Sequence, residues 1–512
     1  MPEPIARRAL LQAGVALPFA AWTGVVLAQS RERLVVRIER DIQNLDPAER
    51  PGAVEGNVIR ALCRNLVAFR RGSFEIENDA ARTIRQTDPT TIDFALEPGL
   101  VFPGDFGRLT AEDVKFSYER FQLPGPTGRK PAYAEDWAAL DHVEVTGELT
   151  GRLILKRPSA GLWKNALADV SGAIQSRLAA AKPGRNADIG LVGAGPYVLA
   201  EWLPNRRLVL RRNPEFRGEA PAFEEIVLRP VADPTTAILG FEAGELQLTR
   251  IEANDRHALA EAKAGKLIDL PSINFVWLGI NMAKPPLDDP RVRRAIRLGI
   301  DVDEVITAAY DGTVERARAV LAPGMLGYWP DAPAPARDPA AARALLAEAG
   351  RTSLRATLTL LDKPAYRNAA EVIQARLGEI GIALDLLPLD DASYWSSGAG
   401  ASGQALELFL GRFGGKADPG FITQWFLPSQ IGSWNWQRWN SPDYAELYAR
   451  ADREGDVEKR AALYVEMQRL MDQSGAFVPL THETNIYLAA GQLDPAILPN
   501  GDDLQYPDFR LG

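Results

Sequence analysis

The chain has 512 residues, more than one hydrophobic core usually organises, so we expect two or three domains. Hydrophobic residues make up 46% of the sequence and charged residues 24%, which is the balance of a soluble globular protein. The formal net charge of −9 argues against binding to nucleic acid or anionic lipid, and the single cysteine, Cys63, excludes an intramolecular disulfide.

The first residues carry the pattern of an export signal. Arg7 and Arg8 precede a mostly apolar run over residues 9–27, and a small residue, Ala28, ends it. We therefore predict a signal peptide over residues 1–28 that is cleaved near Ala28. The string Ala-Arg-Arg-Ala-Leu-Leu-Gln is similar to a twin-arginine motif, and export by the Sec route stays open. A single-span anchor is the alternative, because roughly 19 apolar residues approach the thickness of a bilayer.

The part of the chain that follows alternates strand and helix patterns. Thr110, with Asp113 three residues later, is typical of the capped start of a helix, and the carboxylates of that first turn suit the helix dipole better than catalysis. The other predicted elements are a strand at Leu34–Ile38, a helix within residues 54–69, alternating strands within 82–100, and a strand pair at 142–145 and 153–155.

Glycines and prolines then frame a predicted hairpin. Its strands are Tyr197–Trp202 and Arg207–Arg211, and Asn205 lies in the turn between them. A strand at 225–229 and a helix at 237–246 follow.

The second half of the chain predicts an α/β unit. A strand lies within residues 272–281, and Asp289 with Pro290 is typical of a helix start. Strand, helix and strand alternate afterwards, which predicts a mainly parallel sheet. The predicted elements are helices at 339–349, 369–380 and two within 444–471, strands at 354–360 and 382–387, and a strand at 477–480 that returns the chain to the first lobe.

Four strings of residues carry a family resemblance. They are LTAEDVKFSYER at 109–120, VGAGPYVLAEWLPNRRLVLRRNPEFRG at 192–218, SINFVWLGIN at 272–281 and PPLDDPRVRRAI at 285–296. In this order they resemble the signature of the family 5 extracellular solute-binding proteins, which are the peptide- and nickel-type receptors of ATP-driven importers. The resemblance covers nearly all of the chain after the signal.

This resemblance implies an α/β fold of two lobes, the type II periplasmic-binding-protein fold of the large family with an extra subdomain. The lobes are joined by a hinge of two crossings, expected near Gly279 and Phe477. The expected domains are lobe I at 29–69, 191–272 and 480–512, an accessory subdomain of lobe I at 70–190, and lobe II at 273–479.

The resemblance also implies where the ligand binds. The loop after the first strand, with Arg50 and Gly52, faces the ligand in the family, although a solvated Arg50 is an equal alternative. Peptide-binding relatives carry an acidic residue three positions before the acid of an Asp-Pro step, and it pairs with the ligand's α-amino group. Counting back from Asp418 gives Gly415, so a free peptide amino terminus loses its partner here.

Positive charge and aromatic rings stand near the same segment. Arg412 and Lys416 suit a carboxylate, with orientation toward solvent as the alternative. We place Phe413, Gly415 and Asp418 beside them in the predicted ligand-binding site. Trp434 and Trp436 belong to a dense aromatic stretch that fits a cleft for flat or apolar ligand parts, and packing in the core is the alternative for about half of these rings.

The sequence therefore predicts a periplasmic receptor, and not an enzyme, that delivers a peptide-like or carboxylate-bearing ligand to an ABC importer by cleft closure. Neither G-x-S-x-G nor H-E-x-x-H occurs, and we expect no catalytic residue, metal or cofactor. The expected partners are the ligand and a permease in the inner membrane, with no nucleic acid, and the protein is expected to be a monomer. A secreted hydrolase and a sensor or chaperone-like binder without transport are the alternatives.

Overall fold

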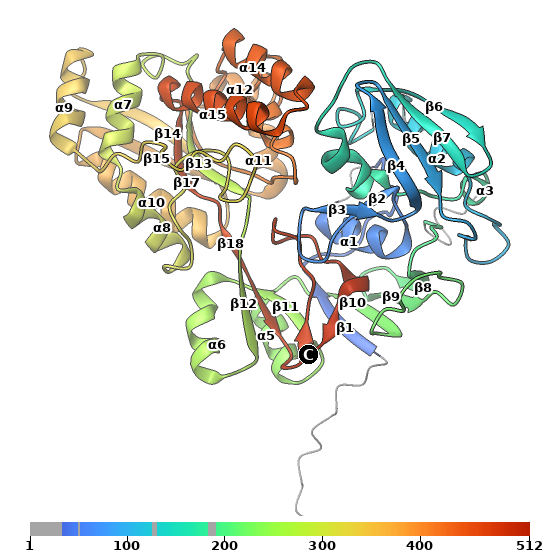
Figure 1. Ribbon diagram of the computed structural model, residues 1–512. Coiled ribbons are helices and arrows are strands. Elements are labelled where there is room, and N and C mark those ends of the chain that lie inside the picture. Colours follow the sequence, from blue (N-terminus) through green and yellow to red (C-terminus); the bar gives the residue numbers. More distant parts are fainter. Residues whose placement is uncertain (1–32, 50–51, 125–130, 183–190) are drawn as a thin grey trace, which may run out of the picture.

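The computed structural model describes residues 33–49, 52–124, 131–182 and 191–512 (Figure 1). The predicted signal peptide with its cleavage near Ala28 lies outside the described residues, and so does Arg50. Figure 1 shows three bodies, each built around one sheet: lobe I at the bottom, lobe II at the upper left and the accessory subdomain at the upper right.

Lobe I contains a seven-stranded sheet of order β12-β18-β11-β1-β10-β9-β8. The central strand β1 runs parallel to β10 and β11, and the other pairs are antiparallel. The predicted hairpin is confirmed as β8 and β9, with Asn205 at a φ of 59° in the turn, a conformation that asparagine tolerates. The elements are β1 (Arg33–Ile38), α1 (Ala53–Leu62), β8 (Tyr197–Leu203), β9 (Arg207–Arg212), β10 (Glu225–Pro230), α5 (Pro234–Glu242), β11 (Leu248–Ile251), α6 (Arg256–Ala262), β12 (Lys266–Pro271), β18 (Thr484–Ala489), β19 (Leu493–Asp494) and β20 (Arg510–Leu511).

The helix expected within residues 54–69 is shorter than predicted. It ends at Leu62, and residues 67–69 form a strand instead. Cys63 takes an extended conformation, and the Asn65 side chain donates to the carbonyl oxygens of Leu167 and Asp169, at 3.0 and 2.7 Å. These long-range contacts hold the chain extended where the local apolar pattern still fits a helix.

The accessory subdomain contains a four-stranded antiparallel sheet of order β4-β5-β7-β6, packed against α2. The predicted start of α2 is confirmed, because the backbone N–H and hydroxyl of Thr110 both donate to the Asp113 carboxylate, at 3.0 and 2.9 Å. The elements are β2 (Val67–Phe69), β3 (Ile76–Asn78), β4 (Ala81–Asp88), β5 (Thr91–Leu96), α2 (Ala111–Glu119), β6 (Leu140–Gly147), β7 (Thr150–Leu155) and α3 (Arg177–Ala180).

Lobe II contains a five-stranded sheet of order β15-β14-β16-β13-β17. Strand β14 is parallel to β15 and β16, whereas β13 is antiparallel to β16 and β17, so the sheet is mixed and the prediction of a mainly parallel sheet is wrong. The strands are β13 (Phe275–Ile280), β14 (Leu354–Leu361), β15 (Ile382–Leu389), β16 (Leu408–Phe413) and β17 (Phe477–Thr481). The helices are α7 (Pro290–Gly299), α8 (Val302–Tyr310), α9 (Pro339–Glu348), α10 (Pro364–Gly378), α11 (Asp391–Ser397), α12 (Ser402–Ala405), α13 (Gly420–Thr423), α14 (Pro442–Arg453) and α15 (Val457–Ser474).

The chain passes between the sheets of lobe I and lobe II at residues 272–274, from β12 to β13, and at residues 482–483, from β17 to β18. Figure 1 shows β12 and β18 rising side by side from the lower sheet toward lobe II. The crossings expected near Gly279 and Phe477 are displaced, because these two residues pair with each other inside the sheet of lobe II. The return to lobe I is therefore made by β18, and the domain boundaries given above stay a prediction.

Candidate ligand-binding site

The segment after β16 brings lobe II against the accessory subdomain. Lys416 extends from this segment, and its Nζ lies 2.7 Å from a carboxylate oxygen of Asp136 and 2.7 Å from one of Asp169. Nζ also donates to the carbonyl oxygen of Asn165 at 3.0 Å. The ring centroid of Tyr133 lies 4.2 Å from Nζ, within the range of a cation–π contact.

These contacts compensate the positive charge of Lys416 in this conformation. An ammonium group has three N–H donors, and three oxygen atoms lie within 3.0 Å of Nζ. Burial alone would lower the pKa of Lys416, but Asp136 and Asp169 together hold it above its ordinary value. Lys416 therefore joins the two bodies through buried ion pairs.

Arg412 differs from Lys416, because its guanidinium stays partly open. Its Nε donates to the Glu483 carboxylate at 2.8 Å, and a terminal nitrogen lies 3.9 Å from Asp502. The side chain is 29% exposed. Since a guanidinium has five N–H donors, Arg412 can bind a ligand carboxylate while it keeps Glu483.

Asp418 has a structural role within lobe II. Its side chain is buried, and its two oxygen atoms accept from the Arg460 guanidinium at 2.6 and 2.8 Å. The backbone N–H of Gly420 donates to the same carboxylate at 2.9 Å. These bonds close the turn that begins α13.

The two glycines of the predicted site have backbone roles. A Cβ at Gly415 would lie 2.8 Å from the Ile273 side chain and 3.1 Å from its carbonyl oxygen, so the close approach of the first crossing requires glycine there. Gly52 is an exposed residue that precedes α1 in lobe I, and its backbone N–H donates to the Glu55 carboxylate at 3.0 Å.

The tryptophans divide into two groups. Trp436 is 2% exposed and lies in the core of lobe II, as does Trp439 at 6%. Trp434 remains partly exposed and contacts other rings edge-on, with centroids 6.0 Å from Phe413 and 6.2 Å from Trp395. We call the four residues Trp395, Phe413, Trp425 and Trp434 the aromatic wall.

The aromatic wall is continuous with the surroundings of Lys416. The rings of Phe421 and Trp425 make an edge-to-face contact with their centroids 5.3 Å apart. The Phe421 centroid lies 4.9 Å from Lys416 Nζ. The structure thus places Lys416 against the accessory subdomain and Arg412 against Glu483 of the second crossing and near Asp502. Phe413 is buried in the core of lobe II together with Trp436, and Trp434 remains partly exposed.

Carboxylates that the sequence did not single out complete this region. Asp502 accepts from Arg250 and Asn274, both at 2.9 Å, and Asp503 accepts from Arg60 at 2.8 Å. Arg60 also donates to Asp169 at 2.8 Å. No local pattern marks these acids, because their partners are distant in the sequence and only tertiary folding brings them together.

A second contact joins the accessory subdomain to lobe II. Asp452, near the end of α14, forms an ion pair with Arg157 and accepts from the Ser159 hydroxyl at 3.1 Å. Its carbonyl oxygen accepts from the backbone N–H of Ala160 at 2.9 Å. The two bodies are thus held together at Lys416 and at Asp452.

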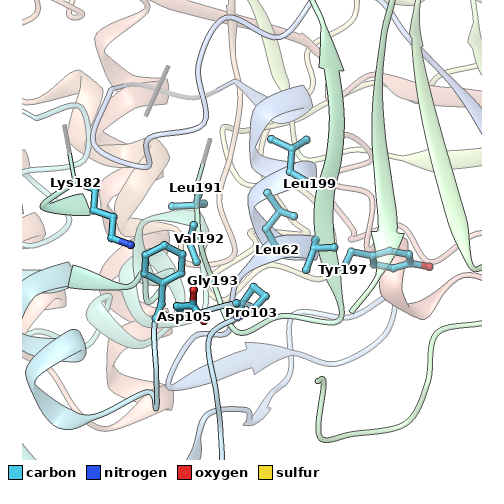
Figure 2. Close-up of a pocket in the computed structure, with 12 residues that line it drawn as sticks. Leu62, Pro103, Asp105, Lys182, Leu191, Val192, Gly193, Tyr197 and Leu199 are labelled. Carbon is cyan, nitrogen blue, oxygen red and sulfur yellow. The ribbon is translucent and has the colours of Figure 1, made fainter. Parts of the chain in front are cut away.

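A cavity of about 350 Å³ lies elsewhere, between lobe I and the accessory subdomain. Figure 2 shows Leu62 and Leu199 on one side of it and Lys182 on another. None of the predicted site residues lines it. Lys182 and Leu191 line the cavity and are the residues next to a range that lies outside the described residues, so we do not assign the cavity as a binding site.

Two features are absent from the described ranges. Across residues 33–49, 52–124, 131–182 and 191–512, no three histidine, cysteine, aspartate or glutamate side chains meet in a way that could hold a metal ion. None of the helices in these ranges is both long enough and apolar enough to cross a bilayer.

Comparisons with known proteins agree with this architecture. The family model of the bacterial extracellular solute-binding proteins, family 5 Middle, matches residues 75–452. The dipeptide-binding protein of Escherichia coli is 26% identical over 451 residues, which cover 83% of this chain and 84% of the relative. Di/tripeptide-binding protein 3 of Pseudomonas aeruginosa is 26% identical over 508 residues, covering 91% and 94%.

Solved structures share the fold. DppA from Helicobacter pylori, in complex with the peptide STSA, has a TM-score of 0.80 at 23% identity and covers 94% of this chain and 98% of its own. NikA from Brucella suis, in complex with Fe(III)-EDTA, has a TM-score of 0.81 at 22% identity and covers 94% and 100%. The fold is thus the two-lobed α/β fold of the type II periplasmic binding proteins, and the family consists of substrate-binding proteins, not enzymes. The chain belongs to the bacterial extracellular solute-binding proteins, family 5.

Proposed function

We propose that this protein is a periplasmic receptor that binds a peptide-like or carboxylate-bearing ligand between lobe II and lobe I and delivers it to an ABC permease. The observation that carries the ligand class is Arg412, whose guanidinium keeps open donors while Glu483 holds it in place. The partly exposed rings of the aromatic wall, Trp395, Trp425 and Trp434, supply apolar surface for the rest of the ligand. The names of the relatives, which are dipeptide- and di/tripeptide-binding proteins, support a peptide-like ligand.

Closure of the lobes follows from the two crossings. A ligand that contacts both lobes binds more tightly to the closed form, and its binding energy shifts the population toward that form. The permease then recognises the closed shape. This mechanism requires no chemical change in the ligand.

Native mass spectrometry of the protein purified from the periplasm of its own host tests the ligand class. We expect a retained adduct that carries a carboxylate. If the protein is empty, a thermal-shift screen of peptides and carboxylates follows, in which a ligand at a hundred times its dissociation constant stabilises by about 2.7 kcal/mol. A screen in which only compounds without a carboxylate bind would overturn the proposal.

The role of Arg412 is tested with matched variants. Arg412→Gln alone leaves Glu483 without its cation, so the double variant Arg412→Gln, Glu483→Gln is the better measurement. We expect both to lose affinity for the ligand, whereas Lys459→Ala, an exposed lysine of α15, keeps it. Unchanged affinity in the double variant would remove Arg412 from the site.

Transport is tested with the permease reconstituted in vesicles, where uptake should depend on this receptor. A receptor that binds the ligand without supporting uptake would instead be a sensor. Cell fractionation tests the proposed periplasmic location, with Arg7→Lys, Arg8→Lys as the export variant. Light scattering tests the proposed monomer.

A further inference from the structure

The accessory subdomain presents a ready-made site for an ammonium group at its contact with lobe II. We call it the lysine cage; its members are Tyr133, Asp136, Asn165, Asp169 and Phe421. All of these except Phe421 belong to the accessory subdomain, while the ammonium they surround belongs to Lys416 of lobe II. The lysine cage therefore forms only when the two bodies meet.

The chemistry of the lysine cage suits a primary ammonium. A carboxylate oxygen of Asp136 and the carbonyl oxygen of Asn165 each accept an N–H group of Lys416, and a carboxylate oxygen of Asp169 lies in ion-pair contact at 2.7 Å. Two ring faces lie 4.2 and 4.9 Å from the nitrogen. A quaternary ammonium would keep the ring contacts but would lose both hydrogen bonds. The arrangement thus distinguishes an ammonium with N–H donors from other cations.

The two carboxylates of the lysine cage differ in whether a second cation also compensates their negative charge. Asp169 also pairs with Arg60, which lies at 2.8 Å on the side of lobe I. The side chain of Asp136 is 6% exposed, and it forms an ion pair with Lys416. A closed form without Lys416 would leave Asp136 buried and uncompensated, which is unfavourable.

We propose that the lysine cage is an ammonium-binding site that the protein fills with its own Lys416 on closure. Lys416 is a tethered cation that holds the accessory subdomain against lobe II and keeps the ammonium group of a ligand out of this position. The statement about the ligand rests on the proposed function; the statement about closure does not. A ligand on the aromatic wall then meets a lysine that is already paired and an arginine, Arg412, that is not.

Chemical rescue tests the site without any knowledge of the ligand. Lys416→Ala removes three carbons and the ammonium group, which n-propylammonium replaces atom for atom. Small-angle X-ray scattering of the ligand-free protein reports the opening of the lobes as an increase in the radius of gyration. We expect Lys416→Ala to be more open than the wild type, and n-propylammonium chloride to restore the wild-type profile in a saturable manner.

Several controls make this result specific. Tetramethylammonium at equal ionic strength has the charge without N–H donors, and n-propanol has the shape without the charge; neither should close Lys416→Ala. Lys416→Met fills the space of the stem and should stay open with n-propylammonium. Lys459→Ala, on the exposed surface of α15, should match the wild type throughout.

The outcomes that overturn the proposal are definite. A Lys416→Ala profile identical to the wild type would show that Lys416 does not hold the lobes, and equal rescue by tetramethylammonium would show that the site does not recognise N–H donors. If Lys416→Ala fails to fold by circular dichroism, Asp136→Asn takes its place. It should open the protein in the same way, and n-propylammonium should not close it; a closed Asp136→Asn would overturn the proposal.

A separate measurement decides the consequence for the ligand. Peptides with free and with acetylated amino termini are titrated into the wild type and Lys416→Ala. We expect Lys416→Ala to gain affinity for the free peptides relative to the acetylated ones, and equal changes for both would overturn the exclusion of a ligand ammonium. Absence of binding by every peptide would contradict the peptide-like ligand and leave the rescue experiment to decide the lysine cage.

Discussion

Arg412 of lobe II and Glu483 of the second crossing are joined by a hydrogen bond of 2.8 Å between Nε and a carboxylate oxygen. Glu483 lies between β17 and β18 with a φ of 57°, and its other oxygen accepts from the hydroxyls of Tyr366 and Tyr310 at 3.0 and 3.3 Å. One carboxylate at the crossing therefore orients the arginine that we assign to the ligand. The geometry of the site and the geometry of the crossing are set by the same residue.

Glu483→Gln should destabilise the protein by about 2 kcal/mol. The change removes the charge opposite Arg412 and one acceptor for the tyrosine hydroxyls, but Arg412 is partly exposed and stays near Asp502, so the loss is smaller than for a fully buried pair. Urea denaturation gives the free energy of unfolding. Stability equal to the wild type would contradict a structural role for Glu483.

Asp418→Asn should cost about 3 kcal/mol, because it leaves the buried Arg460 guanidinium without its carboxylate. The same denaturation experiment measures it. The exposed pair of Glu466 and Arg469 is the matched control, and Glu466→Gln should cost about 0.5 kcal/mol or less. If the two variants lost the same free energy of unfolding, Asp418 would not stabilise the start of α13 as we describe.

His482 predicts how stability depends on pH. Burial lowers its pKa to about 4 from 6.5, although hydrogen bonds to the backbone of Val320 and Ala319 oppose the shift. The unfolded chain therefore takes up a proton first, so the stability that the neutral ring confers is complete above about pH 6.5 and is lost as the pH falls toward 4. At about 1.4 kcal/mol per unit, the loss reaches about 3 kcal/mol.

The measurement is the difference in free energy of unfolding between the wild type and His482→Gln from pH 7 to pH 4. This difference isolates His482 from the carboxylates that titrate in the same range. His142→Gln removes an exposed histidine of β6 and should follow the wild-type curve. A difference that does not change with pH would show that His482 does not titrate in this way.

Gly415→Asp should lower the thermal midpoint, although the family resemblance makes it the substitution that restores amino-terminal recognition. The new Cβ would lie 2.8 Å from Ile273 Cδ1, so the side chain at 273 or the crossing itself must move. Ile273→Ala in the same chain makes room and should recover part of the midpoint. Peptide affinity is then compared in the double variant, where packing no longer obscures it. An unchanged thermal midpoint in Gly415→Asp would show that Ile273 and the first crossing move to accommodate the new side chain without loss of stability.

The sequence determined this protein's family, its α/β class and most of its elements, because these depend on local order. The start of α2 at Thr110, the hairpin turn at Asn205 and the start of α7 at Asp289 each need residues within a few positions of one another, and all three are confirmed. The prediction of a helix is wrong at residues 67–69, where distant contacts outweigh the local pattern. The prediction of a mainly parallel sheet is wrong because strand direction depends on pairing, as for β13.

Only the tertiary structure decided what each site residue does. Arg412 and Lys416 have the same charge and lie four positions apart, yet one keeps open donors and the other is enclosed by acids more than two hundred residues earlier in the chain. Ion pairing and burial depend on which parts of the protein meet in space, and the neighbouring residues in the sequence do not indicate this. The sequence therefore shows which residues are charged, and the packing of the accessory subdomain against lobe II determines which of these charges a ligand can reach.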